Sequence, residues 1–115
     1  MTAALTAAKG ELRVFLTLDT LQPQFAAYMG TPTRARGYPP YAGQHALIIE
    51  VAPGLMIERV MDLALKADPD LEPGILFVER QFGILEIHGN DKGKLLAAGR
   101  AVLAGLGLAE GDQLA

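Results

Sequence analysis

Residues 46–108 alternate between two hydrophobic periods, and this alternation restricts the chain to a sheet that carries helices. The segments of strand length are ALIIEV, GILFVER and FGILEIHG, and the longer segments with helical spacing are PGLMIERVMDLALKA and DKGKLLAAGRAVLAGLGL. Short continuous apolar runs are typical of buried strands, and apolar residues at every third or fourth position are typical of amphipathic helices. The order strand, helix, strand, strand, helix predicts one α+β domain with a single mixed or antiparallel sheet and two main helices.

The first predicted helix begins at Pro53, because a proline at the first helical position lacks only an N–H that would have no partner there. Its apolar stripe consists of Ile57, Val60, Met61, Ala64 and Leu65. On its polar side Asp62 precedes Lys66 by four residues, a spacing at which opposite charges stabilise a helix by about 0.2 to 0.5 kcal/mol. On the residues alone, Lys66 is therefore one half of a surface ion pair.

The second predicted helix follows Asn90 and Asp91, either of which has the short side-chain acceptor that an N-cap needs. Its apolar stripe consists of Leu95, Leu96, Gly99, Val102, Leu103 and Leu106. Gly99 and Gly105 each lower helix propensity by about 1 kcal/mol relative to alanine. They predict a close approach between this helix and the sheet.

The strands predicted over residues 74–80 and 83–88 form an antiparallel hairpin, because they are joined tightly through Gln81 and Phe82. Two orientations of Phe82 remain open at this point. Its ring can project from the turn, or it can fold back on the sheet as in an ordinary hairpin.

The N-terminal part of the chain is less regular. Residues 11–19 alternate with period two, which predicts a strand with one buried face. The apolar members of this alternation are Leu12, Val14, Leu16 and Leu18. An edge strand of the same sheet is the commoner use of such a segment. Proline usually stands at a strand boundary, so residues 24–29 after Pro23 are predicted to form a second short strand. Residues 1–10 are predicted to be a flexible extension and residues 30–43 a loop.

Composition and charge exclude several classes of function. The formal charge is -3, whereas a nucleic-acid surface needs clustered lysine and arginine. Without cysteine the chain has no disulfide, thiolate nucleophile or thiolate metal ligand. No apolar run approaches the roughly 20 residues that span a bilayer. We expect a cytoplasmic protein without nucleic-acid or membrane partners.

Candidate catalytic groups are few. His45 and His88 are the only histidines, they fall on different predicted strands, and neither has a motif partner. Both are interpreted as hydrogen-bonded strand residues, so no catalytic residue, metal site or cofactor is expected. Arg34 and Arg36 could bind an anion, and the neighbouring PPY could dock in an aromatic groove. A solvated loop is the favoured interpretation of both.

Four short motifs together resemble a known family. Pro53-Gly54 opens the first helix, DLALKA at 62–67 closes it, ERQFG at 79–83 joins two strands, and IHG at 87–89 precedes the Ala/Gly-rich helix. Their order and spacing are similar to the shell-protein (BMC) domain of bacterial microcompartments. The similarity is to the circularly permuted, hexamer-forming members of ethanolamine- and propanediol-utilisation compartments.

The resemblance implies an α/β fold of the ferredoxin-like α+β kind, with residues 20–108 as the permuted shell domain and 109–115 as a tail. It implies that Gln81, Phe82 and Gly83 line a central pore and that Lys66 meets its counterpart across the hexamer edge. Residues 11–19 would be an extra strand of a small barrel that caps the pore. The barrel would be filled by Leu12, Val14, Leu16 and Leu18.

Two functions follow from these observations. The first is a structural tile of a microcompartment shell, a homo-hexamer that joins other shell proteins and encloses enzymes. The second is a small ferredoxin-like regulatory module that binds a metabolite or nucleotide between subunits, since such modules also place two helices on one sheet and oligomerise. No enzymatic activity is expected of either.

Overall fold

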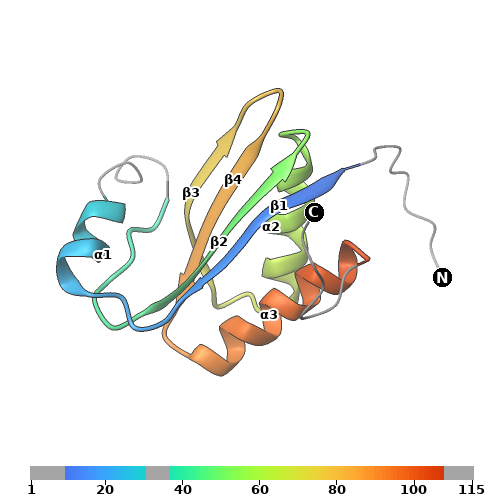
Figure 1. The fold of residues 1–115 in the computed structure, drawn as a ribbon. Coiled ribbons are helices and arrows are strands. Elements are labelled where there is room, and N and C mark those ends of the chain that lie inside the picture. Colours follow the sequence, from blue (N-terminus) through green and yellow to red (C-terminus); the bar gives the residue numbers. More distant parts are fainter. Residues whose placement is uncertain (1–9, 31–36, 108–115) are drawn as a thin grey trace.

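The computed structural model describes residues 10–30 and 37–107. Within them the chain forms four strands and three helices (Figure 1). These are β1 (Glu11–Leu18), α1 (Pro23–Gly30), β2 (His45–Ala52), α2 (Met56–Ala67), β3 (Glu72–Val78), β4 (Gly83–Gly89) and α3 (Lys92–Gly105). Residues 1–9 of the extension predicted over 1–10, the loop residues Arg34 and Arg36 and the tail predicted at 109–115 lie outside the described residues.

The four strands make one sheet in the order β1-β2-β4-β3, and every neighbouring pair is antiparallel. The predicted α+β class is therefore confirmed, and the sheet is antiparallel rather than mixed. α2 and α3 pack against the same face of this sheet, which we call the helix face. No helix in the described part of the chain is long and apolar enough to span a bilayer.

The main core lies between the helix face and the two long helices. Leu47 and Ile49 of β2 and Leu85 and Ile87 of β4 are completely buried there. The helices contribute Ile57, Val60, Ala64, Leu95, Ala98 and Val102 to the same cluster. The apolar stripes predicted for both helices therefore face the sheet, except for Leu96, which is half-buried and belongs to neither hydrophobic cluster. A second, smaller cluster packs α1 against the opposite face, which we call the open face, near Ala46.

β1 is an edge strand of this sheet, which corrects the expectation of an extra strand outside the domain. It pairs with β2 from Glu11 opposite Ala52 to Leu18 opposite Ala46. The commoner interpretation of the terminal segment is thus the one that the structure adopts. The resemblance implied that a strand outside the sheet would form the pore-capping barrel. β1 is instead a member of the sheet.

A β-bulge in β1 also changes which of its leucines are buried. The pairing with β2 shifts between Leu12 and Val14, so that Arg13 has no direct partner. A bulge adds one residue and moves every later side chain to the other face of the sheet. Leu12 consequently packs into the main core, and after the bulge Phe15 takes that role. Leu16 is 50% exposed.

Residues 24–29 form most of α1 and not the short strand that we predicted. Pro23 is the first residue of the helix, where proline is as acceptable as it is at a strand boundary. The side chain of Gln22 caps this helix, because its Oε1 accepts a hydrogen bond from the backbone N–H of Phe25 at 2.9 Å. In the described residues α1 therefore joins the two main helices that were predicted.

The two long helices begin close to the predicted positions. Asp91 is the N-cap of α3, since its Oδ1 accepts a hydrogen bond from the backbone N–H of Lys94 at 3.1 Å. α2 begins three residues later than Pro53. The backbone N–H of Gly54 bonds outside the helix, to the carbonyl oxygen of Arg80, so the chain forms a turn before α2 starts.

Candidate functional site

The turn between β3 and β4 spans four residues, Glu79 to Phe82, and is the part of the molecule to which the sequence assigned a pore. The backbone N–H of Glu79 donates to the carbonyl oxygen of Phe82 at 2.8 Å and closes the turn. Gln81 is exposed, Phe82 is half-buried and Gly83 is buried at the start of β4. Of the three predicted pore residues, Gln81 is therefore the one most open to solvent.

The turn is attached firmly to the loop before α2. Gly54 donates to the carbonyl oxygen of Arg80 at 3.2 Å. A Cβ at Gly54 would lie 1.5 Å from the carbonyl oxygen of Glu79, and one at Gly83 would lie 2.8 Å from Ile57. Only glycine allows these backbones to approach so closely. The position of the turn is thus fixed by the start of α2.

Phe82 turns towards the sheet. The centroid of its ring lies 5.8 Å from that of Phe77, at an interplanar angle of 39°. Phe77 is opposite Ile84 in β4, on the open face. This arrangement is the ordinary-hairpin alternative that the sequence left open.

Glu79 and Arg80 belong to the ERQFG motif but were not among the predicted pore residues, and both are exposed in the same turn. Two charged residues between apolar strands are the signal that could have drawn attention to them. The tip of the turn therefore exposes one acidic, one basic and one neutral polar side chain, those of Glu79, Arg80 and Gln81.

Lys66 lies in the last turn of α2, and its side chain is 75% exposed. Its Nζ is 2.9 Å from Oδ2 of Asp62, which confirms the predicted ion pair. Since α2 begins beside the β3–β4 turn and rises 1.5 Å per residue, Lys66 lies about 15 Å along the helix from the turn. The two predicted sites are at opposite ends of one rigid element.

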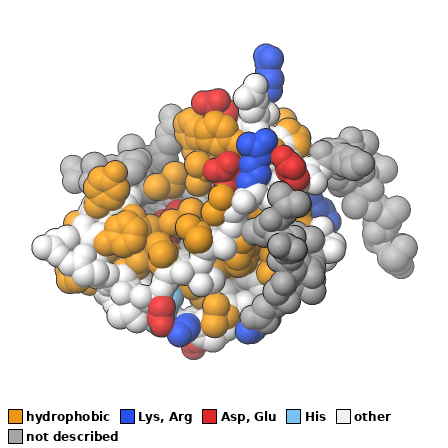
Figure 2. All heavy atoms as spheres, viewed as in Figure 1, with side chains coloured by type: hydrophobic (Ala, Val, Ile, Leu, Met, Phe, Trp, Pro, Cys, Tyr) orange, Lys and Arg blue, Asp and Glu red, His pale blue; other side chains and the backbone are white. Residues whose placement is uncertain are grey.

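The leucines assigned to the barrel do not share a face. Leu12 is buried in the main core, whereas Leu18 packs against the cluster around α1 on the open face. Figure 2, in the same view as Figure 1, shows hydrophobic side chains gathered over the strands and around α1. The exposed ones include Leu16, Phe25, Tyr28 and Phe77.

Both histidines are hydrogen-bonded strand residues, as predicted. His88 is completely buried, and its Nδ1 lies 2.8 Å from Oε2 of Glu86, which is also buried. Nδ1 of His45 lies 2.8 Å from Asp19 and accepts from the backbone N–H of Thr20 at 3.1 Å. No group of three potential metal ligands occurs among residues 10–30 and 37–107.

Asp19 connects the end of β1 to α3. Its Oδ2 lies 2.7 Å from Nζ of Lys92, and its Oδ1 accepts from the hydroxyl of Thr20 at 3.0 Å. The hydrogen bond from Lys92 is the main reason that the pKa of this carboxyl is below its usual value of 3.8.

Comparisons with known proteins agree with this geometry. A sequence family described as the CsoS1D N-terminal domain matches residues 12–112. The chain is 46% identical over 104 residues to the carboxysome shell protein CcmP of Synechococcus elongatus. The matched region covers 90% of this chain and 47% of that protein. It is 45% identical over 97 residues to the carboxysome shell protein CsoS1D of Prochlorococcus marinus, covering 84% of this chain and 37% of that one.

Two solved structures have the same fold. One is a double ringed trimeric shell protein from the RMM microcompartment, with a TM-score of 0.80 and 55% identity, covering 91% of this chain and 48% of that one. The other is a fused permuted hexameric shell protein from the same microcompartment, with a TM-score of 0.78 and 52% identity, covering 85% of this chain and 46% of that one. The chain thus spans about half the length, or less, of these relatives.

Proposed function

The chain belongs to the CsoS1D N-terminal domain family, and we propose from this that it is a structural unit of a bacterial microcompartment shell. The observation that carries the proposal is the match over residues 12–112, together with the TM-score of 0.80 to a shell protein at 55% identity. A shell unit needs a rigid body and surfaces for neighbours rather than a catalytic centre. The buried, hydrogen-bonded state of His88 agrees with a structural role.

We propose that six copies of this domain form a ring. The trimeric relative is built from chains about twice as long, so a ring of three of those chains has about the mass of a ring of six of these. The exposed apolar side chains over the strands and α1 support an oligomer, because contiguous exposed apolar surface is typical of interaction sites.

Within this ring the β3–β4 turn faces the axis and Lys66 faces the outer edge. Three features support this orientation: the turn is exposed, it is rigidly held by Gly54, and it lies at the opposite end of α2 from Lys66. Gln81, with Glu79 and Arg80, lines the aperture, while Phe82 and Gly83 support the turn from behind. Neighbouring rings and other shell proteins meet at the edge, and encapsulated enzymes lie behind the tile.

Cysteine cross-linking tests the ring and its orientation together, because the natural chain has no cysteine. The variant Gln81→Cys is oxidised with a short-range oxidant and analysed by denaturing electrophoresis. We expect a covalent dimer, since each turn has a neighbour around the axis and the single cysteine of each chain can form one disulfide. Lys94→Cys at the start of α3 is the matched control and is expected to remain monomeric under denaturing conditions.

Native mass spectrometry of the unmodified protein measures the number of 12.2 kDa chains directly. Six chains support the proposed ring. A two-chain particle, together with no covalent dimer of Gln81→Cys, would support the regulatory alternative, in which a ligand lies between two subunits.

A further inference from the structure

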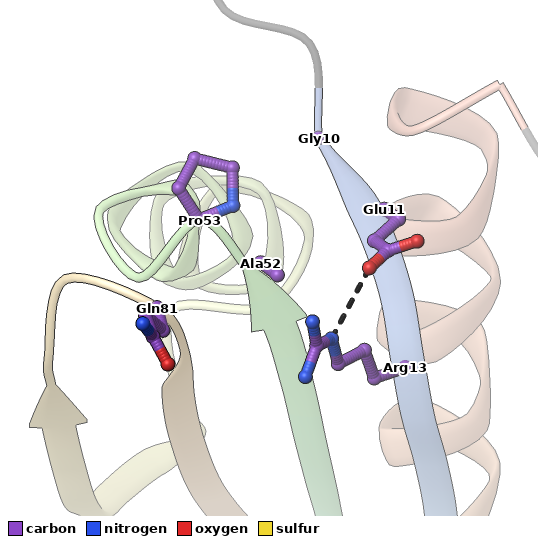
Figure 3. Close-up of a pocket in the computed structure, with 6 residues that line it drawn as sticks. All are labelled: Gly10, Glu11, Arg13, Ala52, Pro53 and Gln81. Atoms are coloured by element: carbon purple, nitrogen blue, oxygen red, sulfur yellow. Dashed lines mark hydrogen bonds and ion pairs between the residues drawn. The ribbon is translucent and has the colours of Figure 1, made fainter.

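β1 has an ion pair at each end, and the two pairs differ in whether a proton can switch them. At its start the permanently charged Arg13 bonds to Glu11, with Nε 3.2 Å from Oε1 (Figure 3). Just beyond its end the carboxylate of Asp19 meets the imidazole of His45, the first residue of β2. Histidine is the side chain that ordinarily changes charge between about pH 5 and 8. Of these two pairs, the second is therefore the one that responds to a modest change of pH.

Nδ1 of His45 has a donor and an acceptor within hydrogen-bond distance at the same time. The backbone N–H of Thr20 is directed at it with an N–N distance of 3.1 Å, and Oδ1 of Asp19 lies 2.8 Å away. An unprotonated ring nitrogen accepts a hydrogen bond, whereas a protonated one donates. One nitrogen cannot do both, so each charge state of the ring satisfies one of these contacts and opposes the other.

The charged groups around this ring come from two elements. Asp19 approaches from the end of β1, and its Oδ2 lies 2.7 Å from Nζ of Lys92 on α3. α1 has no charged residue, the residue opposite His45 in β4 is Gly89, and the carboxylate of Asp91 is used as the N-cap of α3. Hydrogen bonds, the largest from Lys92, hold the pKa of Asp19 below 3.8. Its carboxylate is therefore ionised throughout the range in which histidine changes charge.

The donor in this arrangement has an uncommon backbone conformation. Thr20 has a φ of 55°, which is rare for a β-branched residue. Residues in such conformations persist where surrounding contacts hold them, and they are common in switch regions. One such contact is the bond from Thr20 to His45, and the next is the bond from the N–H of Leu21 to the carbonyl oxygen of Gln44 at 2.7 Å. α1 follows at Pro23, so these two contacts set its approach to the sheet.

We propose that His45 is a pH-sensitive latch for α1. When the ring is neutral, Nδ1 accepts from Thr20 and holds the turn that leads into the helix. When the ring is protonated, Nδ1–H donates to Asp19, and this charge-assisted bond is stronger than the neutral bond that it replaces. The N–H of Thr20 then has no acceptor in the protein, and α1 loses one of its attachments to β2.

α1 is suited to respond to this change because it is lightly packed. It has eight residues, of which only Ala26 and Met29 are buried, in the small cluster around Ala46. A segment with few buried contacts opens at a lower free-energy cost than the core. Phe25 and Tyr28 are exposed on it and belong to the apolar surface that we assign to neighbouring subunits. At this step the inference rests on the proposed function, and it implies that acid weakens the contacts between subunits.

NMR of the assembled protein between about pH 8 and pH 5.5 tests the latch. The imidazole nitrogen signals distinguish a protonated from an unprotonated Nδ1, and we expect Nδ1 of His45 to be unprotonated in the neutral ring. As the ring is protonated, the protection of the Thr20 amide against solvent exchange should fall by about fivefold, the usual effect of losing one neutral hydrogen bond. The amide of Lys94 is the matched control, because it is also exposed and also donates to a side chain at 3.1 Å, Oδ1 of Asp91. Its protection should not change.

The variant His45→Asn removes the switch but keeps an acceptor. The side-chain oxygen of asparagine lies close to the position of Nδ1 and accepts at every pH in this range, so the protection of Thr20 should show no pH step. Native mass spectrometry at decreasing protein concentration then measures assembly. The natural ring should dissociate at a several-fold higher concentration at pH 5.5 than at pH 8, whereas the ring of His45→Asn should dissociate at the same concentration at both.

A protonated Nδ1 in the neutral ring, or a Thr20 amide whose protection does not fall on protonation, would overturn the latch. The same pH dependence of dissociation in His45→Asn and the natural protein would overturn its effect on assembly. Failure here is separable from failure of the proposed function. A six-chain ring without a step in Thr20 protection contradicts only this inference, whereas that step in a protein that forms no ring contradicts only the shell proposal.

Discussion

The backbone N–H of Gly54 donates to the carbonyl oxygen of Arg80 at 3.2 Å, so the loop that leads into α2 holds the turn between β3 and β4. This bond makes the turn part of the same rigid body as the helix. A pore built from six such turns requires that each has one position. The hydrogen bond therefore restricts movement of the turn relative to α2, which the proposed aperture requires.

Replacing Gly54 by alanine should disturb this contact strongly. The new Cβ would lie 1.5 Å from a backbone oxygen of Glu79, and backbone cannot move aside as a flexible side chain can. We expect a loss of at least about 2 kcal/mol in the free energy of unfolding, measured by denaturant titration. Gly93→Ala in the first turn of α3 is the control, because there the nearest contact would be 3.4 Å away. It should gain about 0.5 to 1 kcal/mol. Equal effects would disprove the close packing at Gly54.

The ring pair of Phe77 and Phe82 should be measurable as a coupling energy. Aromatic pairs at such separations contribute about 0.5 to 1.5 kcal/mol beyond the area that they bury. A double-mutant cycle with Phe77→Leu and Phe82→Leu, followed by urea unfolding, should give a value in that range. The cycle of Phe82→Leu with Phe25→Leu on α1 is the control and should give no coupling. A coupling of zero for the first pair would mean that Phe82 points away from the sheet.

Lys66→Ala tests the outer edge of the tile. The side chain is exposed and its ion pair with Asp62 is worth no more than about 0.5 kcal/mol, so the fold should remain intact. Electron microscopy should show rings that no longer assemble into extended sheets. Lys94→Ala removes a similarly exposed lysine, 58% accessible and 3.5 Å from Asp70, and should leave assembly unchanged. Sheets of normal extent in Lys66→Ala would remove the edge role.

The ionisation of Asp19 should make the stability of the protein depend on pH in the acid range. Its pKa in the folded protein is below the usual 3.8, mainly because Lys92 hydrogen-bonds the charged form. The folded state therefore favours the ionised carboxylate, and the resulting stability is present above pH 3.8. It is lost as the pH falls through the lowered pKa.

The variant Asp19→Asn isolates this contribution. Above pH 3.8 it should unfold at lower denaturant concentration than the natural protein, and the difference should shrink as the pH falls below that value. Asp70→Asn is the comparison, because its lysine contact is longer, at 3.5 Å against 2.7 Å for Asp19. A difference that stays constant down to the acid limit would exclude the carboxylate of Asp19 as the source.

The sequence predicted the β3–β4 hairpin and both long helices because their apolar periods extend over many residues. The sequence also predicted an N-cap at Asn90 or Asp91, which is Asp91 in the structure, and the close approach of Gly99 to the sheet. A Cβ at Gly99 would lie 3.1 Å from the ring of Phe15. Each of these two features depends on a single residue, an aspartate that caps or a glycine that lacks a side chain, and the sequence shows that residue directly. The direction of Phe82 does not, because it is decided by a neighbour, Phe77, on the adjoining strand.

The N-terminal part was predicted less well for two physical reasons. Pro23 suits the start of a helix as well as the boundary of a strand, so its presence could not distinguish α1 from a short strand. The bulge at Arg13 adds a single residue and leaves the alternation of leucines intact in the sequence. Only the pairing with β2 shows that the buried face changes there.

The two sides of that bulge give the last prediction, since they place Leu12 and Leu16 in different surroundings. Leu12 is 8% exposed within the main core, and Leu12→Ala should cost about 2 to 3 kcal/mol. Leu16 is 50% exposed, and Leu16→Ala should cost less than about 1 kcal/mol. Denaturant unfolding of the assembled protein is the measurement, because a shared barrel between subunits would bury both residues alike. Equal losses would therefore show that the leucines of β1 share one buried face, and would contradict the bulge.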